Sequence, residues 1–182
     1  MKSQLLAAAL TLAATVTATT GASASPPPSP TSSPSGPACS AMENDFANIA
    51  DQPVATAIAQ VPQLSTLAEA VDQADLVENM DSAETITLFA PTNQAFEALP
   101  QERRDEIMDN DERLSEVLNY HMVQGKQSLS DLQGATLTSL QGGQLAVKGS
   151  GENLTINGAQ IICANVPTSN ATVHIIDKVL MP

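Results

Sequence analysis

The hydrophobic positions of this chain are spaced as in helices over the first half and as in strands over much of the second half. Between Pro53 and Pro62, apolar residues recur at intervals of three and four, which predicts one amphipathic helix. The same spacing returns over residues 64–77 and predicts a second helix. The domain is therefore expected to open with two amphipathic helices.

The pattern changes at residues 85–90, where apolar and polar residues alternate and predict a strand that Pro91 ends. Thr92 has the side chain of a helix N-cap, so a short helix is expected between this residue and Pro100. A polar helix is expected over residues 101–108. One strand thus lies among short helices in this part of the chain.

After a further helix that begins near Asp111, the pattern from Tyr120 onward indicates strands. Asn157-Gly158 lies between two short apolar runs and is the strongest hairpin signal in the chain. Gly142-Gly143 indicates another hairpin, and the β-branched segment 172–176 predicts a closing strand. Helices followed by strands, without strict alternation, favour the α+β class.

Composition adds that the core must be mainly aliphatic. Of the 182 residues, 42% are hydrophobic, but there is no Trp, one Tyr and three Phe. This is enough apolar surface for one domain of ordinary size. Leu, Ile, Val and Ala must fill most of its core.

Charge narrows the range of partners. The formal net charge is -13, and 17 of the 20 carboxylates lie between Glu43 and Glu116, where three arginines oppose them. A surface this acidic repels phosphate backbones and anionic membranes, so nucleic acid is excluded as a partner. The carboxylates themselves are interpreted as a solvated helical face.

Residues 1–24 have the three parts of a secretory signal peptide. Lys2 is followed by an apolar run over residues 5–16 and by a small-residue cleavage site that ends at Ala24. The run is too short for a membrane span, and the sequence shows no second one. We expect cleavage after Ala24, no transmembrane segment, and a secreted protein that is extracellular or loosely associated with the cell wall.

Residues 25–37 contain only Pro, Ser, Thr and Gly, a composition that cannot bury a core. Residues 25–45 are therefore predicted to be a disordered spacer that includes a disulfide anchor, and residues 46–182 a folded domain. The spacer fits either an extended tether or a leader left by processing. Its hydroxyl groups also permit O-glycosylation.

The two cysteines, Cys39 and Cys163, are an even number in a chain that carries an export signal. In an oxidising compartment this predicts a disulfide between the start of the domain and a late strand. A lipoprotein role for Cys39 is disfavoured, because no apolar-small-small pattern precedes it.

The motifs of common enzymes and metal sites are absent from the sequence. No Ser lies in a G-x-S-x-G turn, and His121 is not part of H-E-x-x-H. The loop at Gly149 lacks the third glycine of a dinucleotide site, and the run at Asp109 lacks the ligands of a calcium loop. We therefore expect no catalytic residue, no metal site, no cofactor and no enzymatic activity.

Three segments, in this order, resemble the fasciclin domain. Residues 87–93, with Phe96 after them, are similar to the first signature of that family; Tyr120-His121 resembles its central pair; and residues 173–180 resemble its final strand. The resemblance covers residues 46–182. It is strongest to small single-domain members from high-GC Gram-positive bacteria, the immunogenic secreted proteins, which also carry cysteines just before the domain and in a late strand.

The resemblance implies an α+β wedge, with a β-sandwich and helices packed against it. It also implies a role in cell adhesion or contact with a cell-surface or extracellular-matrix protein, without catalysis or cofactor. We expect the protein to be a monomer. The signature residues to which we assign structural roles are Thr87, Phe89, Ala90, Pro91, Thr92, Asn93, Phe96, His174 and Asp177.

Two interpretations of the central pair stay open. In adhesive members of the family the Tyr-His region is linked to receptor recognition, which would make Tyr120 and His121 binding residues. We favour structural roles for both, because a packed Tyr and a hydrogen-bonded core His are common. The N-glycosylation patterns at Asn153 and Asn170 are expected to be mostly unused.

A second class of function also stays open, namely a binding module for a small apolar ligand or an envelope polysaccharide. Adhesion predicts an exposed patch near residues 120–124 or on the closing strand. Capture of an apolar ligand instead predicts an enclosed apolar pocket.

Overall fold

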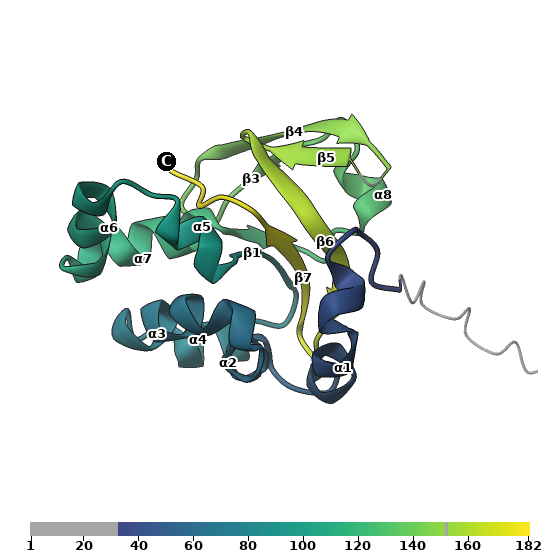
Figure 1. Ribbon diagram of the computed structural model, residues 1–182, viewed down its shortest axis with the longest axis horizontal. Coiled ribbons are helices and arrows are strands. Elements are labelled where there is room, and N and C mark those ends of the chain that lie inside the picture. Colours follow the sequence, from purple (N-terminus) through teal and green to yellow (C-terminus); the bar gives the residue numbers. More distant parts are fainter. Residues whose placement is uncertain (1–32, 152) are drawn as a thin grey trace, which may run out of the picture. The chain divides into compact units, whose positions relative to one another are not determined.

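The computed structural model describes residues 33–151 and 153–182. The predicted signal peptide, its cleavage site and residues 25–32 of the predicted spacer lie outside these residues. The helices are α1 (Cys39–Ile49), α2 (Val54–Gln60), the 3-10 turn η1 (Pro62–Leu64), α3 (Ser65–Gln73), α4 (Val77–Ser82), α5 (Asn93–Glu97), α6 (Gln101–Met108), α7 (Asp111–Tyr120) and α8 (Leu129–Leu132) (Figure 1). The strands are β1 (Ile86–Pro91), β2 (Met122–Gln124), β3 (Thr136–Thr138), β4 (Gln144–Ser150), β5 (Asn153–Ile156), β6 (Ala159–Pro167) and β7 (Ala171–Ile176).

The strands form one mixed sheet in the order β2-β1-β7-β6-β5-β4-β3. β1 and β7 pair in parallel, whereas the other neighbours are antiparallel. The two outer strands, β2 and β3, also approach each other. Val123 bridges to Ser139, and the Leu140 amide donates to the Met122 carbonyl at 2.8 Å. The sheet therefore curls almost into a barrel, which leaves little free edge.

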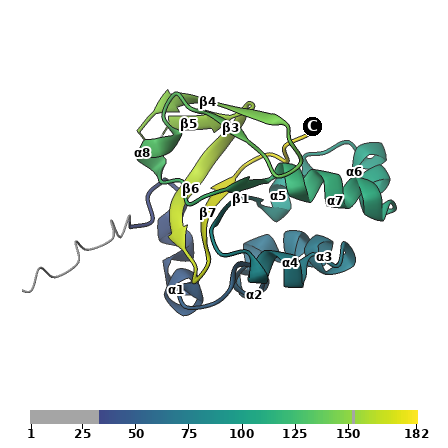
Figure 2. The same ribbon diagram turned by 180° about the vertical axis from the view of Figure 1, so that it is seen from behind.

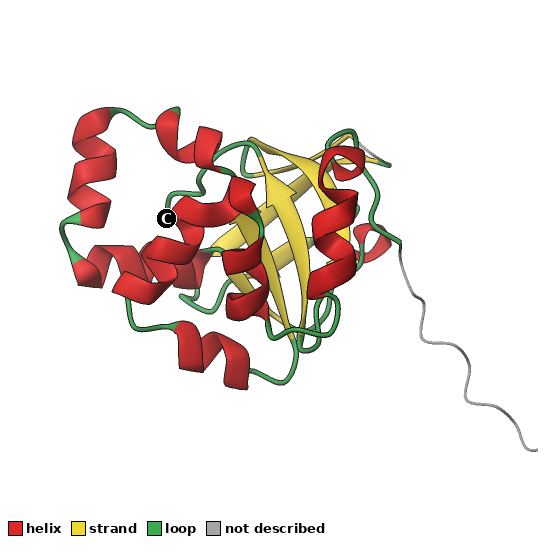
Figure 3. Ribbon diagram, turned by 60° about the horizontal axis from the view of Figure 1, so that its bottom comes forward, coloured by secondary structure: helices red, strands yellow, loops and turns green. Residues whose placement is uncertain are grey.

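Two hydrophobic clusters hold this arrangement together. One lies between the helices and the outer face of β1, β6 and β7, and includes Leu67, Leu114 and Val173. The other fills the inside of the curled sheet and includes Phe89, Leu145 and Ile156. Most helices lie on one side of the strands (Figures 2 and 3), whereas α8 contributes Leu132 to the inner cluster. The predicted α+β class and the mainly aliphatic core are confirmed.

Strand β1 separates the two clusters. Leu88 and Ala90 face the helices, whereas Phe89 points into the curled sheet, and all six residues of the strand are buried. An alternating pattern is typical of a strand with one buried face, but here both faces are buried. Phe89, the aromatic residue between Leu88 and Ala90, packs into a second core. This core forms only because the sheet closes on itself.

Both predicted hairpins are confirmed. β5 and β6 are joined by Asn157 and Gly158, whose φ angles of 47° and 87° fit the tight hairpin turn for which this dipeptide is favoured. β3 pairs with β4 around Gly142-Gly143. Gly143 has a second requirement, since a Cβ there would collide with the Tyr120 ring.

The predicted helices are present, but the one expected over residues 64–77 ends at Gln73, where Asp75 adopts a positive φ of 54°. Three helices, α1, α4 and α8, were not predicted. The short helix α8 follows β2. Helix α1 begins at Cys39, within the segment predicted to be spacer, and buries Met42, Phe46 and Ile49. The spacing of these three residues is typical of a helix, so the sequence does contain a signal for α1. The adjacent Pro-rich run led to a prediction of disorder instead. Among the described residues, no helix is long and apolar enough to span a membrane.

Candidate functional site

Tyr120, the last residue of α7, lies inside the curled sheet. Its side chain is 5% exposed and belongs to the inner cluster. The hydroxyl donates to the Gln144 carbonyl at 3.2 Å and accepts from Asn157 Nδ2 at 2.8 Å. The ring thus joins the end of α7 to β4 and to the β5–β6 turn.

His121 caps α7 and is only 1% exposed. The Leu180 amide donates to its Nε2 at 2.9 Å, so Nδ1 carries the proton and donates to the Val117 carbonyl at 2.7 Å. Burial lowers the pKa of His121 to about 4, although the hydrogen bond to Val117 acts in the opposite direction. The neutral imidazole therefore fastens the segment after β7 to α7.

These contacts bear on the two interpretations of the pair. Both rings are buried, so a partner has almost no access to either of them. The two residues lie at the end of helix α7, with Tyr120 as its last residue and His121 as its C-cap. Both side chains are engaged inside the domain, as a structural role requires. The exposed patch expected near residues 120–124 or on the closing strand is not found, because Tyr120 to Val123 and most of β7 are buried.

Replacing His121 by Ala should therefore lower the free energy of unfolding by about 3 kcal/mol, because two buried hydrogen bonds and the packing of the ring are lost. Urea unfolding at pH 7.5 measures this change. Binding assayed well below the midpoint of thermal unfolding should be retained. Full stability combined with lost binding would instead identify His121 as a recognition residue.

His174 in β7 is completely buried and stacks on Phe89, with ring centroids 5.5 Å apart. The Asn165 amide donates to Nδ1 at 3.3 Å, and Nε2 donates to the Gln127 carbonyl at 3.0 Å. Burial lowers the pKa of His174 to about 4, opposed by the hydrogen bond to Gln127. This histidine holds the loop that follows β2 against the sheet.

Thr87 in β1 holds the same loop. Its Oγ1 donates to the Gly125 carbonyl at 2.7 Å and accepts from the Gln127 amide at 2.8 Å. Asn165, at a positive φ of 59°, accepts from the Leu129 amide at 2.8 Å. No local pattern in the sequence indicates this role of Asn165, because it depends on an irregularity in β6.

The other signature residues also act within the fold. Thr92 accepts from the Ala95 amide at 3.3 Å and caps α5, as predicted. Asp177 accepts from the Gln160 amide at 2.7 Å and fixes the turn after β7. Ala90 and Phe96 lie in the cluster beneath the helices, and Pro91 ends β1.

Asn170, the residue just before β7, joins several elements through its side-chain amide. Its Nδ2 donates to the carbonyls of Met80, Asp81 and Ala83 at 2.8, 3.2 and 3.0 Å. Its Oδ1 accepts from the Val54 amide at 2.9 Å. The amide thus joins α2, α4 and β7, and a glycan on this nitrogen would break the join. The sequence showed only a glycosylation pattern here.

The predicted disulfide between Cys39 and Cys163 is confirmed, with a sequence separation of 124. The segment before α1 lies along β6, since Ser35 pairs with Ala164 and the Ala38 amide donates to the Ile162 carbonyl at 3.0 Å. Gly36 is required there, because a Cβ would approach the Ile162 carbonyl to 2.5 Å. The disulfide fastens α1 and this segment to the sheet.

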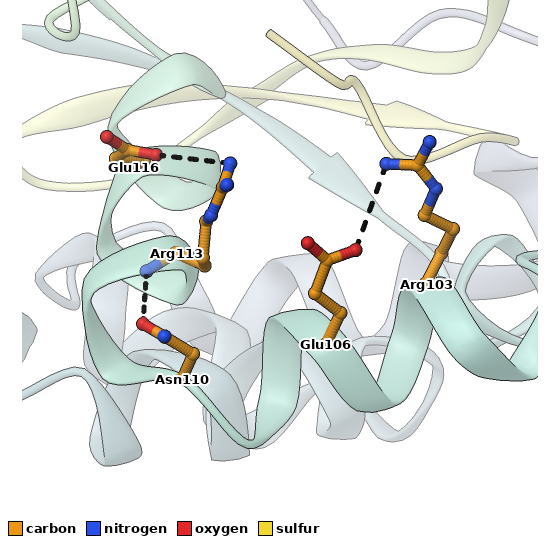
Figure 4. A network of polar contacts seen from close by, with 5 residues as sticks. All are labelled: Arg103, Glu106, Asn110, Arg113 and Glu116. Carbon is orange, nitrogen blue, oxygen red and sulfur yellow. Dashed lines mark hydrogen bonds and ion pairs between the residues drawn. The ribbon is translucent and has the colours of Figure 1, made fainter.

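The acidic surface follows the helices. α6 buries only Ile107, and the three arginines of the chain lie on α6 and α7. Arg103–Glu106 and Arg113–Glu116 approach at 3.9 and 4.0 Å, and Asn110 accepts from the Arg113 amide to cap α7 (Figure 4). Because these side chains are more than half exposed, the ion pairs contribute little to stability, as expected for a solvated face.

Two open hollows lie on either side of the segment that precedes α1. One, of about 510 Å³, is lined by Pro34, Phe46, Pro167 and neighbouring residues. The other, of about 580 Å³, lies where that segment meets η1, α5 and the turn after β7. Within residues 33–151 and 153–182, no three His, Cys, Asp or Glu side chains are placed to hold a metal ion.

Comparison with known proteins connects the fold to a family. The model of the fasciclin domain matches residues 62–182. The immunogenic protein MPB70 of Mycobacterium bovis is 39% identical over 154 residues, which cover 82% of this chain and 76% of that protein. The cell surface glycolipoprotein MPB83 of the same species is 40% identical, with coverage of 82% and 66%.

A solved structure shares the fold. It is that of a FAS1 domain pair from the insect cell adhesion molecule fasciclin I, with a TM-score of 0.54 and 21% identity. The match covers 65% of this chain and 45% of that chain. At this identity the likeness concerns the fold alone.

Proposed function

Since this chain belongs to the fasciclin domain family, we propose that it is an exported, non-catalytic protein that mediates adhesion or interaction at a cell surface or in an extracellular matrix. Its partner would be a cell-surface or matrix protein, and the chain would act as a monomer. The export signal, the acidic surface and the disulfide support this location, because disulfides persist in oxidising compartments.

The main observation behind the proposal is that the polar side chains of the signature segments form hydrogen bonds inside the fold. Tyr120, His121 and His174 are buried, and each is hydrogen-bonded within the domain. No buried side-chain N or O atom of the described residues lacks a hydrogen-bond partner. Side chains engaged in this way build a rigid scaffold rather than a reactive centre.

The relatives support the same conclusion. One relative is named a cell surface glycolipoprotein, and the fold neighbour comes from a cell adhesion molecule. A rigid domain that carries its charge on exposed helices suits contact with a large partner. The second candidate function, capture of a small apolar ligand, has less support, because the two hollows beside the segment that precedes α1 are open and partly polar.

An adhesion assay tests the proposal. Fluorescent beads coated with the secreted chain should be retained on matrix-coated surfaces and on intact cells several-fold more than beads coated with an unrelated acidic protein of equal net charge. The control removes the non-specific effect of charge. Equal retention of the two kinds of bead, at both low and physiological salt, would refute the proposal.

A further inference from the structure

The hollow of about 580 Å³ has the size of a small-ligand site and draws on five separate parts of the chain. Ala38 precedes α1, Gln63 belongs to η1, Gln94 to α5, Ile162 to β6, and Asp177 follows β7. The complete lining is Ala38, Pro62, Gln63, Thr92, Asn93, Gln94, Ile162 and Asp177. We refer to it as the junction groove.

Both walls of the junction groove are held firmly. On one side, Asn93 Oδ1 accepts from the Thr66 amide at 3.1 Å, and its Nδ2 donates to the Pro62 carbonyl at 3.0 Å and to Ser65 Oγ at 3.1 Å. On the other side, Ala38 and Ile162 are hydrogen-bonded and flank the Cys39–Cys163 disulfide in sequence. The groove is therefore organised before any ligand enters, which lowers the entropic cost of binding.

Polar groups without partners in the described chain remain in this groove. Thr92 Oγ1 accepts from the Ala95 amide, but no described residue accepts its proton. Asp177 accepts the Gln160 amide through Oδ1, and no described donor reaches Oδ2. Gln63 and Gln94 are exposed, and their side-chain amides make no hydrogen bond to a described residue. The groove thus offers a hydroxyl donor, a carboxylate acceptor and two carboxamides.

The charge of the lining restricts the ligand. Asp177 is the only charged residue in the lining, and the chain as a whole carries -13. Sulfated, phosphorylated or uronic polymers would be repelled. The apolar side chains of Ala38, Pro62 and Ile162 can pack against a methyl group or the face of a sugar ring.

We propose that the junction groove binds a neutral, N-acetylated oligosaccharide carried by the cell-surface or matrix partner. This inference rests on the proposed function and assigns it a binding surface. An acetamido group presents one N–H donor and one carbonyl acceptor, and each carboxamide of Gln63 and Gln94 can complement both. Sugar hydroxyls suit Asp177 Oδ2 and the Thr92 proton. The acetyl methyl suits the apolar side chains.

A titration monitored by NMR tests this inference. Triacetylchitotriose serves as the probe. The amide signals of Gln63, Gln94, Ile162 and Asp177 should shift as it is added, and the shifts should saturate at about 1 mM sugar. A weak affinity of this order is expected when binding depends on a few exposed hydrogen bonds. A sulfated oligosaccharide of equal length should cause no shifts at these positions. An absence of shifts with the neutral sugar up to about tenfold higher concentration, or shifts confined to other surfaces, would overturn the inference.

Two variants sharpen the test. Gln63→Ala/Gln94→Ala should weaken binding about tenfold without changing the melting temperature, because both side chains are exposed. Gln101→Ala/Gln133→Ala, a matched pair of exposed glutamines elsewhere, should leave binding unchanged. Asp177→Asn keeps an acceptor for the Gln160 amide but replaces the second acceptor by a donor, so it should also weaken binding. Equal affinity of all variants would overturn the inference.

The outcomes separate the two proposals. If beads coated with the chain adhere but no neutral sugar binds in the groove, the junction groove is not the adhesive surface and the proposed function stands. If the sugar binds but the beads do not adhere, the groove is a ligand site and the adhesive function fails. Adhesion that triacetylchitotriose competes away supports both.

Discussion

Lowering the pH from 7.5 to 4 should destabilise the domain by about 3 kcal/mol for each of its two buried histidines. The pKa values of His121 and His174 are lowered to about 4 in the fold, against 6.5 for a free imidazole. Above pH 6.5 both the folded and the unfolded chain carry neutral histidines, so stability is unaffected there. Between pH 6.5 and 4 only the unfolded chain takes up the protons, and stability falls. Below pH 4 both states are protonated and the loss stops growing.

Geometry explains why protonation is costly at these positions. In each ring one nitrogen already accepts a backbone N–H, from Leu180 in His121 and from Asn165 in His174. A second proton would point at that donor, inside a core without solvent. As the pH is lowered, the backbone amides nearest these contacts, around residues 125–129 and 178–182, should therefore be the first to exchange faster.

Urea unfolding of the wild-type chain and of His121→Gln and His174→Gln, at pH 7.5, 6, 5 and 4, measures this effect. Each variant should be less stable at pH 7.5 but lose less stability on acidification, since one titrating group is gone. The many carboxylates titrate in the wild-type chain and in both variants, so the difference between chains isolates each histidine. Parallel stability–pH curves for the three proteins would contradict the prediction.

Removal of the disulfide should have the second large effect. The bond joins residues 124 apart, and loss of this constraint on the unfolded chain should lower the free energy of unfolding by about 5 kcal/mol. For a domain of this size that corresponds to a fall in melting temperature of roughly 10–20 °C. The change to make is Cys39→Ala/Cys163→Ala, which leaves no unpaired thiol in the core.

Calorimetry of this double variant gives the global loss, and hydrogen exchange gives its location. The fold should persist, because Met42, Phe46 and Ile49 still pack α1 against the sheet. The amides of Ala38 and Ala164, which join the segment before α1 to β6, should exchange faster. Melting that stays within about 2 °C of the wild-type value would show that the bond contributes little to stability.

The sequence by itself determined the local elements of this protein. Helix α6, the N-cap Thr92, both hairpins and the helix that carries Leu114 follow from spacing, capping and turn chemistry. These features depend on residues that are near one another in the chain, so a local pattern is sufficient to predict them. The pairing of Cys39 with Cys163 followed because only two cysteines are present.

Only the tertiary structure decided what lies on the two faces of β1 and which polar side chains are engaged. The second core around Phe89 exists because the outer strands β2 and β3 meet, and no local pattern encodes that contact. The burial of His121 and the hydrogen bonds of Asn170 depend on carbonyls and amides far along the chain. The junction groove unites five segments separated in sequence, and such a surface forms only when the whole chain has folded.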